Sequence, residues 1–267
     1  MKERATVNLT GVPETLFIPL RIRAAETLRP DAIISDPDAV EILKAINFTP
    51  SEKDKISKGS QIGTVIRTIL FDKITATFLK ENPHGVVVNI GCGLDARYKR
   101  FTHTGCLWFD LDVEETIAVR KQFFQEADRY KMIACSMLDY QWMDAVPKDT
   151  PVLFISEGVM MYFDEKAIRE LFCEIAERFT KANIAFDIMR KWLLKQQHPD
   201  VKKYNAPFKW ALDNPKELEK WHNNIRFKQE LYFMSYGGKR TPLLMRIAMF
   251  IVPSFKKSFK IVHINLV

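Results

Sequence analysis

Short apolar runs alternate with amphipathic stretches along most of the chain. The apolar runs predict buried β-strands at residues 86–90, 107–112, 132–135, 152–155, 184–188, 225–233 and 260–267. The clearest helical pattern lies at 164–180, where Ile168, Leu171 and Ile175 recur on one face at the helical period. Strands that alternate with helices indicate an α/β fold with a doubly wound, mostly parallel sheet.

Before residue 86 the chain has no strand pattern. Helices are predicted at 15–28, 36–46 and 62–80, and the polar stretch 49–59 is predicted as a loop. A chain of 267 residues with 47% hydrophobic content can bury a large core and is near the upper size of one α/β domain. We therefore expect a single domain with appended helices.

The residues after the first predicted strand carry the candidate chemistry. The turn Gly91-Cys92-Gly93-Leu94-Asp95-Ala96 has the pattern Gly-x-Gly-x-x-Ala, and the next predicted strand ends in Asp110-Leu111-Asp112. A glycine turn after a strand, with an acid about 20 residues further on, is typical of a nucleotide site in a doubly wound sheet. Glycine lets a ligand lie against bare backbone, and Asp110 or Asp112 can accept hydrogen bonds from ribose hydroxyls. The pattern favours a ribose-bearing cofactor; a plain tight turn, with one acid capping the next helix, is the alternative.

Basic residues concentrate toward the end of a chain whose formal net charge is +7. Those that follow residue 238 are Lys239, Arg240, Arg246, Lys256, Lys257 and Lys260. Such a segment can contact nucleic acid, an anionic membrane or an acidic substrate. Because these residues are scattered among apolar positions, a solvated face is favoured and no nucleic-acid partner is expected.

The four cysteines form no Cys-x-x-Cys pair and no His-bracketed metal spacing. They are interpreted as reduced thiols of a cytoplasmic protein, and no metal site is expected. The first residues have no apolar segment behind them, and the apolar run at 243–252 is short and interrupted by Arg246. Neither a signal peptide nor a membrane span is predicted.

Several separate motifs follow one another in the order found in a known family. They are Phe17-Ile18-Pro19-Leu20, Arg29-Pro30-Asp31 with Asp36-Pro37, Ile66-Arg67-Thr68 with Phe71-Asp72, residues 87–97, residues 108–112, Ser156-Glu157-Gly158-Val159-Met160-Met161-Tyr162, and Ala206-Pro207-Phe208-Lys209-Trp210. Together they resemble the leucine carboxyl methyltransferase superfamily, and more narrowly its bacterial branch, named for tetracenomycin-type polyketide O-methyltransferases. The resemblance covers nearly the whole chain. It implies one domain with a Rossmann-like methyltransferase sheet: a helical N-terminal cap and lid at 1–82, a cofactor-binding core at 83–190, and an acceptor cap with the final strands at 191–267.

The resemblance also implies S-adenosyl-L-methionine as the cofactor. Arg67 matches the arginine that binds the methionine carboxylate, a contact that suits a planar guanidinium. Asp72, further along the same predicted helix, would orient Arg67. Gly91 and Gly93 would contact the methionine and ribose parts.

Further positions match the rest of the cofactor. Asp112 matches the ribose-binding acid, and Asp110 matches the acid two residues earlier. Leu138 and Asp139 match the adenine edge. Glu157 would hold the cofactor amino group or shape the methyl-transfer site, and a buried structural carboxylate is its alternative role.

The acceptor is predicted to be a small molecule, for instance one that is polyketide-like. Tyr162, Phe208 and Trp210 would line its pocket, although aromatic residues are commonest as core. Methyl transfer is an in-line displacement, so the protein mainly aligns the acceptor oxygen and excludes water. A carboxylate acceptor needs no general base, whereas a hydroxyl needs one, and none of the five histidines can be assigned that role.

The predicted function is S-adenosylmethionine-dependent O-methyl transfer to a carboxylate or hydroxyl oxygen. An NAD-dependent oxidoreductase also fits the glycine turn and the acid, but it leaves Arg67 and Glu157 without a purpose. A cofactor-binding module without catalysis is a third possibility. The loop at 49–59 lies just before the helix that carries Arg67, where it would serve as a lid or as a plain connection.

Overall fold

The computed structural model describes residues 13–46, 56–195 and 206–267. Most of the predicted loop at 49–59 falls outside these ranges, so the lid stays a prediction.

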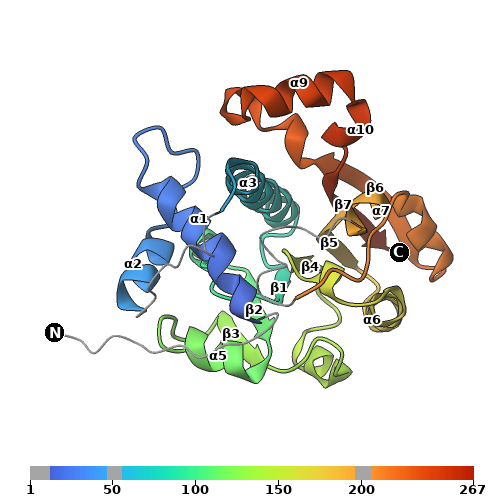
Figure 1. Cartoon of the computed structure of the whole chain (residues 1–267). Coiled ribbons are helices and arrows are strands. Elements are labelled where there is room, and N and C mark those ends of the chain that lie inside the picture. The colour runs from blue at the N-terminus through green and yellow to red at the C-terminus, as the bar shows by residue number, and fades with distance from the viewer. Residues whose placement is uncertain (1–12, 47–55, 196–205) are drawn as a thin grey trace.

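A seven-stranded sheet forms the centre of the protein (Figure 1). Its strands are β1 (Val86–Ile90), β2 (Leu107–Asp112), β3 (Tyr130–Ala134), β4 (Val152–Ser156), β5 (Ala182–Met189), β6 (Ile225–Tyr232) and β7 (Phe259–Leu266). Their spatial order is β3-β2-β1-β4-β5-β7-β6. Strands β1 to β5 are parallel, and β7 runs antiparallel to both β5 and β6. The predicted α/β fold with a mostly parallel sheet is confirmed.

Helices cover both faces of this sheet. The α-helices are α1 (Phe17–Thr27), α2 (Pro37–Ala45), α3 (Lys58–Glu81), α4 (Arg97–Arg100), α5 (Glu114–Arg120), α6 (Glu165–Arg178), α7 (Lys191–Leu194), α9 (Leu243–Ile251) and α10 (Pro253–Lys256). Short 3-10 turns connect several elements, among them η4 (Tyr140–Ala145) and η5 (Met160–Tyr162).

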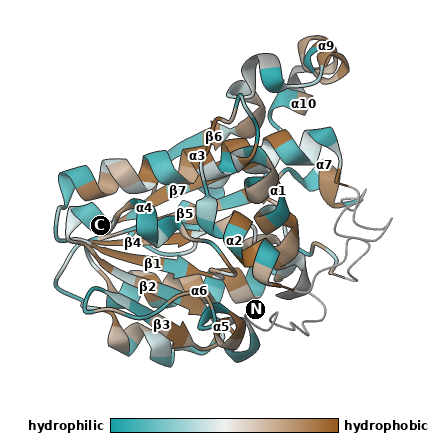
Figure 2. Ribbon diagram, turned by 90° about the vertical axis from the view of Figure 1, so that its left-hand side faces the viewer, coloured by the Kyte–Doolittle hydropathy of each residue, from teal (hydrophilic) through white to brown (hydrophobic). Residues whose placement is uncertain are grey.

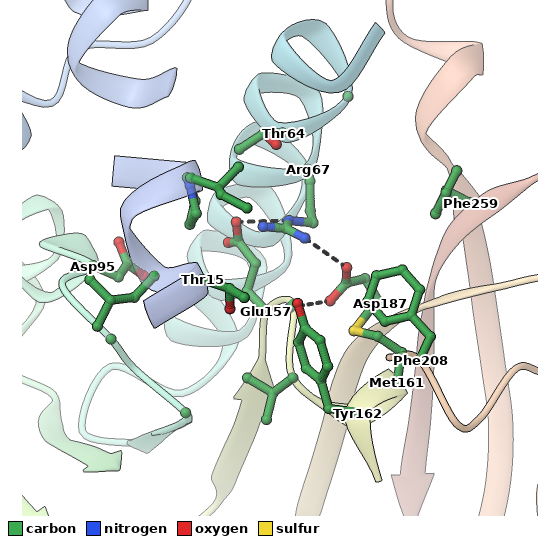
Figure 3. A pocket seen from close by; sticks show the side chains of 18 of the residues that line it. Thr15, Thr64, Arg67, Asp95, Glu157, Met161, Tyr162, Asp187, Phe208 and Phe259 are labelled. Atoms are coloured by element: carbon green, nitrogen blue, oxygen red, sulfur yellow. Dashed lines mark hydrogen bonds and ion pairs between the residues drawn. The ribbon is translucent and has the colours of Figure 1, made fainter. Parts of the chain in front are cut away.

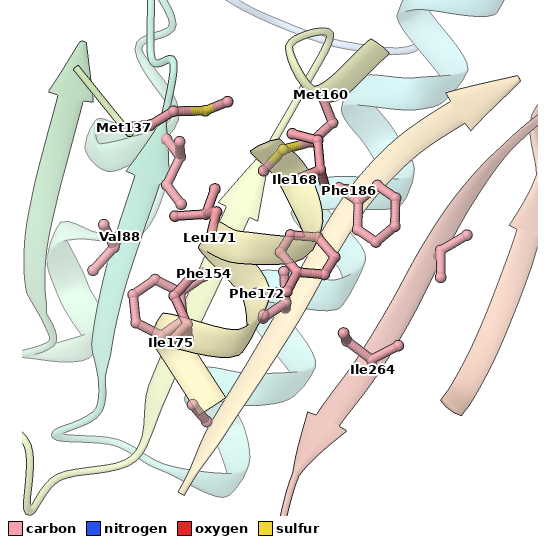
Figure 4. Close-up of a cluster of buried hydrophobic side chains, with 14 of the residues drawn as sticks. Val88, Met137, Phe154, Met160, Ile168, Leu171, Phe172, Ile175, Phe186 and Ile264 are labelled. Atoms are coloured by element: carbon pink, nitrogen blue, oxygen red, sulfur yellow. The ribbon is translucent and has the colours of Figure 1, made fainter. Parts of the chain in front are cut away.

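Successive side chains of each strand enter two different cores, one on each face of the sheet. In β1, Val88 packs into the core around α6, whereas Val87 packs into the core formed with α1 and α3. Figure 4 shows the first core, where the rings of Phe172 in α6 and Phe186 in β5 lie 5.2 Å apart. The central strands β1, β2 and β4 are predominantly hydrophobic (Figure 2). Because both faces are covered, the strand ends are left to form the site.

Side-chain caps set the starts of two important helices. Asp164 caps α6 by accepting a hydrogen bond from the backbone N–H of Ala167 at 2.9 Å. Ser57 caps α3 by accepting one from the N–H of Ser60 at 3.0 Å. Helix α3 therefore begins at Lys58, and the predictions of a loop to residue 59 and a helix start at 62 are wrong.

The late apolar run at 243–252 folds as helix α9 and its C-terminal cap. This helix has nine residues. In the described ranges, no helix combines the length and the apolar character needed to cross a membrane.

Candidate functional site

A cavity of about 470 Å³ lies at the carboxyl ends of β1, β2, β4 and β5, with residues of α1 and α3 closing it (Figure 3). In open parallel sheets, ligands bind beyond these strand ends, at the strand where the chain connections diverge to the two sides. Strand β1 is that strand, because it pairs with β2 on one side and β4 on the other.

The glycine turn after β1 forms one wall of the cavity. Gly91 and Gly93 have backbone φ angles of 68° and 50°, in the left-handed region that favours glycine. A Cβ on Gly91 would lie 2.4 Å from Cγ2 of Val159, so the turn has no room for a side chain there. Both glycines border the cavity and present backbone to it.

Asp112, the last residue of β2, borders the same cavity and is held in one orientation. Its Oδ2 accepts a hydrogen bond from the backbone N–H of Gly93 at 2.8 Å, and its Oδ1 accepts one from that of Val113 at 2.8 Å. Burial raises the pKa of Asp112, although these two N–H groups oppose the rise. Each carboxylate oxygen keeps a further lone pair that a hydroxyl can use.

Asp110 does not border the cavity, which corrects its assignment as a ribose contact. It is fully buried. Its Oδ1 accepts from Trp108 Nε1 at 2.9 Å and from Asn89 Nδ2 at 3.1 Å, and its Oδ2 accepts from the Tyr130 hydroxyl at 2.7 Å. Arg120 donates to the same Oδ2. The hydrogen-bonding capacity of Asp110 is therefore used within the protein.

Arg120 of α5 connects this buried acid to the glycine turn. Besides the Asp110 carboxylate, it donates to the backbone carbonyls of Gly93 at 2.9 Å and Asp95 at 2.7 Å. Its positive charge also favours the ionised form of Asp112, whose pKa it lowers. Asp110, the first acid of the motif, thus supports the turn through Arg120 and does not border the cavity.

Arg67 enters the cavity from α3 between two carboxylates (Figure 3). Its Nε donates to Glu157 Oε1 at 3.0 Å, and its Nη1 donates to Asp187 Oδ2 at 3.0 Å. Burial alone would lower the pKa of Arg67, but the charges of Asp187 and Glu157 outweigh it and raise the pKa. The guanidinium is therefore charged and fixed in place.

Glu157, directly after β4, is shared between two arginines. Its Oε1 accepts from Arg67, and its Oε2 accepts from the fully buried Arg97. Burial would raise the pKa of Glu157, but these two arginines lower it. Asp72 does not orient Arg67 as predicted; it accepts from Arg97 Nε at 2.7 Å instead.

Asp187 is the residue that the sequence reasoning missed. It lies inside the apolar strand β5, borders the cavity, and accepts a hydrogen bond from the N–H of Gly158 as well as from Arg67. Burial raises the pKa of Asp187, with Arg67 and the Gly158 N–H opposing the rise. A single acid within a buried strand is the signal that could have identified it, since such residues are rarely buried without a partner.

Two of the three predicted acceptor contacts lie at the cavity. Tyr162 and Phe208 both border it, and their ring centroids are 5.2 Å apart. Trp210 does not border the cavity, and its buried ring packs against Phe186 and Trp221 in the core. Further large apolar side chains on the wall include Met161, Met189, Leu193, Phe233, Met245, Phe255 and Phe259.

The two residues predicted for the adenine edge are not on the cavity wall. Leu138 and Asp139 do not border the cavity, whereas Cys135, Ser136 and Met137 do. Asp139 is exposed and caps η4. The turn into η4 therefore carries residues 138 and 139 past the cavity wall.

Comparison with known sequences gives consistent matches. The family model described as leucine carboxyl methyltransferase matches residues 17–176. The tetracenomycin polyketide synthesis O-methyltransferase TcmP of Streptomyces glaucescens is 31% identical over 228 residues, which cover 84% of each chain. The S-adenosyl-L-methionine-dependent methyltransferase dpfgK of Gibberella zeae is 25% identical over 255 residues, covering 87% of this chain and 86% of the relative.

Solved structures share the fold at low sequence identity. Magnesium protoporphyrin IX methyltransferase from Synechocystis, with bound SAH, superposes with a TM-score of 0.53 at 11% identity, covering 80% of this chain and 89% of that one. Geranyl diphosphate C-methyltransferase from Streptomyces coelicolor gives 0.51 at 15% identity, covering 94% and 98%. These likenesses support the sheet topology alone.

Proposed function

The chain belongs to the leucine carboxyl methyltransferase family and is an S-adenosylmethionine-dependent methyltransferase, and on that premise we propose that it methylates an oxygen atom of a small, apolar acceptor. The observation that carries this proposal is one cavity that joins a fixed Arg67 and Asp112, which suit the cofactor, to an apolar wall beside Asp187, which suits the acceptor.

Arg67 fits the carboxylate at the methionine end of the cofactor. A guanidinium has five N–H donors. In the described part of the chain, Glu157 and Asp187 engage two of them. The remaining donors can bind a carboxylate with paired, charge-assisted hydrogen bonds. In this proposal Glu157 and Asp187 position Arg67, and Asp112 accepts from the ribose hydroxyls.

The charges around the cavity suit a cationic cofactor. Among the described residues, the charged side chains on its wall are Arg23, Arg67, Asp95, Asp112, Glu157 and Asp187. Acids thus outnumber cations on the wall, which favours a ligand that carries a positive sulfonium. When bound, this cofactor supplies the electrophilic methyl group.

The same charges favour a neutral hydroxyl over a carboxylate as acceptor. Arg23 is already bound to Asp36, at 2.8 Å from its Nε, and Arg67 is bound to Glu157 and Asp187. Once the cofactor carboxylate occupies the remaining donors of Arg67, an anionic acceptor would meet no further free cation among the described residues of the wall, and burying an unpaired charge is unfavourable. A hydroxyl attached to an apolar or aromatic skeleton avoids this penalty.

A hydroxyl acceptor must lose its proton when its oxygen bonds to the methyl group. We assign that proton to the carboxylate of Asp187, which lies at the end of the sheet next to Tyr162 and the apolar wall. In Figure 3 the Tyr162 hydroxyl points toward Asp187. Burial raises the pKa of Asp187, which increases the affinity of this carboxylate for a proton.

A paired acceptor screen tests the proposal. The protein is incubated with methyl-labelled S-adenosylmethionine and with phenols, aliphatic alcohols and carboxylic acids built on the same carbon skeletons. We expect label in methyl ethers of the hydroxyl compounds. Transfer confined to carboxylic acids would refute the hydroxyl assignment, and transfer to nitrogen or carbon atoms would refute O-methylation altogether.

The NAD-dependent oxidoreductase is not retained. A function as an NAD-dependent oxidoreductase leaves Arg67, and the Glu157 and Asp187 carboxylates that bind it, without a role. It is also inconsistent with the methyltransferase family to which the chain belongs.

A further inference from the structure

Helix α9 presents a continuous apolar face to solvent. Its exposed apolar side chains are Leu243 (66% exposed), Leu244 (82%), Ile247 (45%), Phe250 (88%) and Ile251 (69%). At 3.6 residues per turn they form one arc of roughly 120° around the helix. Met245 and Met249, on the opposite side, pack against the protein core. An exposed apolar face of this kind marks a site of interaction.

Helix α9 lies at the outer edge of the molecule. Figures 1 and 2, which are turned by 90°, both show α9 and α10 at the outer edge beyond the sheet and its covering helices. Leu244 and Phe250 have the highest exposed fractions on this projecting helix. The apolar face of α9, formed by Leu243, Leu244, Ile247, Phe250 and Ile251 and called the crest below, is therefore convex. A convex apolar face can insert into a deformable surface that has no matching groove.

The segment of the chain that carries this apolar face is basic and contains no acid. Residues 231–267 include no Asp or Glu. Arg246 lies at the margin of the apolar arc, and Lys256 and Lys257 follow in and after α10; all three are exposed. An apolar crest flanked by cations is complementary to a surface that is apolar beneath an anionic layer.

We propose that α9 docks the protein on an anionic lipid surface. Leu244 and Phe250 enter the boundary between headgroups and acyl chains, while Arg246, Lys256 and Lys257 contact the anionic headgroups. A second copy of the chain fits less well. A two-fold contact through this face would oppose like charges, and the segment has no acid to neutralise them.

Docking at α9 would bring the lipid surface beside the cavity. Met245 of α9 and Phe255 of α10 both border the cavity, while their neighbours in sequence are exposed. An apolar acceptor dissolved in lipid could then enter over these two side chains. This delivery role rests on the proposed function, whereas the docking itself does not.

Vesicle flotation tests the docking without any enzyme assay. The full chain is mixed with vesicles of phosphatidylcholine alone or with added phosphatidylserine, at low and high salt. We expect flotation with the anionic vesicles and its loss at high salt. The double substitution Leu244→Glu and Phe250→Glu should reduce binding at least about tenfold, because it removes both inserting side chains and adds negative charge.

A matched control separates docking from general apolar exposure. Val267 is 63% exposed and follows β7 at the sheet edge opposite the cavity, so Val267→Glu should float like the wild type. Thermal shift with S-adenosylhomocysteine checks that each variant is folded, independently of any acceptor. Failure of the wild type to float with either vesicle overturns the proposal. So does a concentration-dependent dimer, or a complex with an acidic protein, that the double substitution abolishes while flotation persists.

Discussion

Asp110 and Asp112 lie two residues apart in β2, and their neighbours give them different roles. Asp112 borders the cavity, whereas Asp110 is fully buried against Arg120 and Tyr130. An acid at a ligand site affects affinity. An acid that neutralises a buried arginine affects the folded state, because its loss leaves a buried charge uncompensated.

Asparagine substitutions should separate these two roles. Asp112→Asn is expected to weaken S-adenosylhomocysteine binding by about 1–3 kcal/mol, the value of a lost charge-assisted hydrogen bond. Asp110→Asn is expected to lower the free energy of unfolding by about 3–5 kcal/mol. Calorimetry and urea unfolding measure the two effects. If Asp110→Asn weakens binding while the free energy of unfolding is unchanged, the roles of the two acids are reversed.

Arg67→Lys should weaken S-adenosylhomocysteine binding by about 1.5–3 kcal/mol, because an ammonium cannot hold Glu157, Asp187 and a ligand carboxylate with one planar group. Arg178→Lys, a change between Glu174 and the carbonyl of Tyr140 in the α6 region, is the matched control and should leave the affinity unchanged. Equal affinity of wild type and Arg67→Lys in calorimetry would remove Arg67 from the site.

Asp187→Asn tests the proton acceptor at the level of kinetics. The amide can still accept a hydrogen bond from Arg67, so cofactor affinity should fall less than about tenfold, while turnover with a hydroxyl acceptor should fall about 100-fold or more. The rate should also lose its rise with pH through the pKa of Asp187. A parallel fall in affinity and turnover, with an unchanged pH profile, would reduce Asp187 to a residue that only positions Arg67.

At the scale of elements, the glycine turn couples β1 to the loop after β4. Gly91→Ala should lower the free energy of unfolding by roughly 1–3 kcal/mol, because alanine is strained at φ 68° and its Cβ would lie 2.4 Å from Val159. Gly63→Ala in α3 is the control. No atom lies within 4 Å of its added Cβ, so it should raise stability by about 0.5–1 kcal/mol. Urea unfolding of both variants measures the difference, and equal stability would contradict the packing of Val159 on the turn.

The elements were predictable where the pattern is local. The apolar run 86–90 and its glycine turn were placed correctly, because a buried strand and a tight turn depend on neighbouring residues. Asp72 was assigned to Arg67 by closeness in sequence. Five residues along a helix do not share a face as three or four do, and Asp72 instead meets Arg97.

The partners that complete the site could not be read from local patterns. Arg67 and Asp187 are 120 residues apart, and only the pairing of β4 with β5 brings the end of β5 beside Glu157. Leu138 and Asp139 were predicted at the site, whereas Ser136 and Met137 border the cavity, and the reason is similar. Which of these residues reach the cavity depends on where the chain turns into η4. Family resemblance supplied the matching positions, but the packing decided which of them reach the cavity.

At the scale of the whole molecule, one buried histidine should link stability to pH. His263 in β7 lies between Gln229 and Asn183, and burial, with a smaller effect of Lys228, lowers its pKa from 6.5 to about 3. The unfolded chain binds a proton at this residue as the pH falls through 6.5, whereas the folded chain stays neutral until about 3. The free energy of unfolding should therefore fall as the pH is lowered between these values, by up to about 1.4 kcal/mol per pH unit, and gain nothing further from this residue above 6.5.

Urea unfolding at several pH values measures this dependence. His263→Gln should remove that part of the slope between pH 6 and about pH 4, a window taken from the two pKa values of His263. His103→Gln, a change at an exposed position, should keep it. Identical slopes in wild type and His263→Gln would show that the buried ring does not resist protonation.

Strands β6 and β7 are neighbours in the sheet, and the chain between them forms the projecting part with α9 and α10. Tyr232, where this excursion leaves the sheet, pairs directly with Lys260, where it returns. The two ends of residues 233–258 therefore lie side by side next to β6 and β7, on the other side of the sheet from β2, the strand that carries Asp112. Replacing residues 233–258 with the corresponding segment of a relative would therefore change the outer wall of the cavity and the proposed docking helix together. If this segment determines acceptor choice and docking, as proposed, such an exchange would change both properties and leave the methyl-donor site in place.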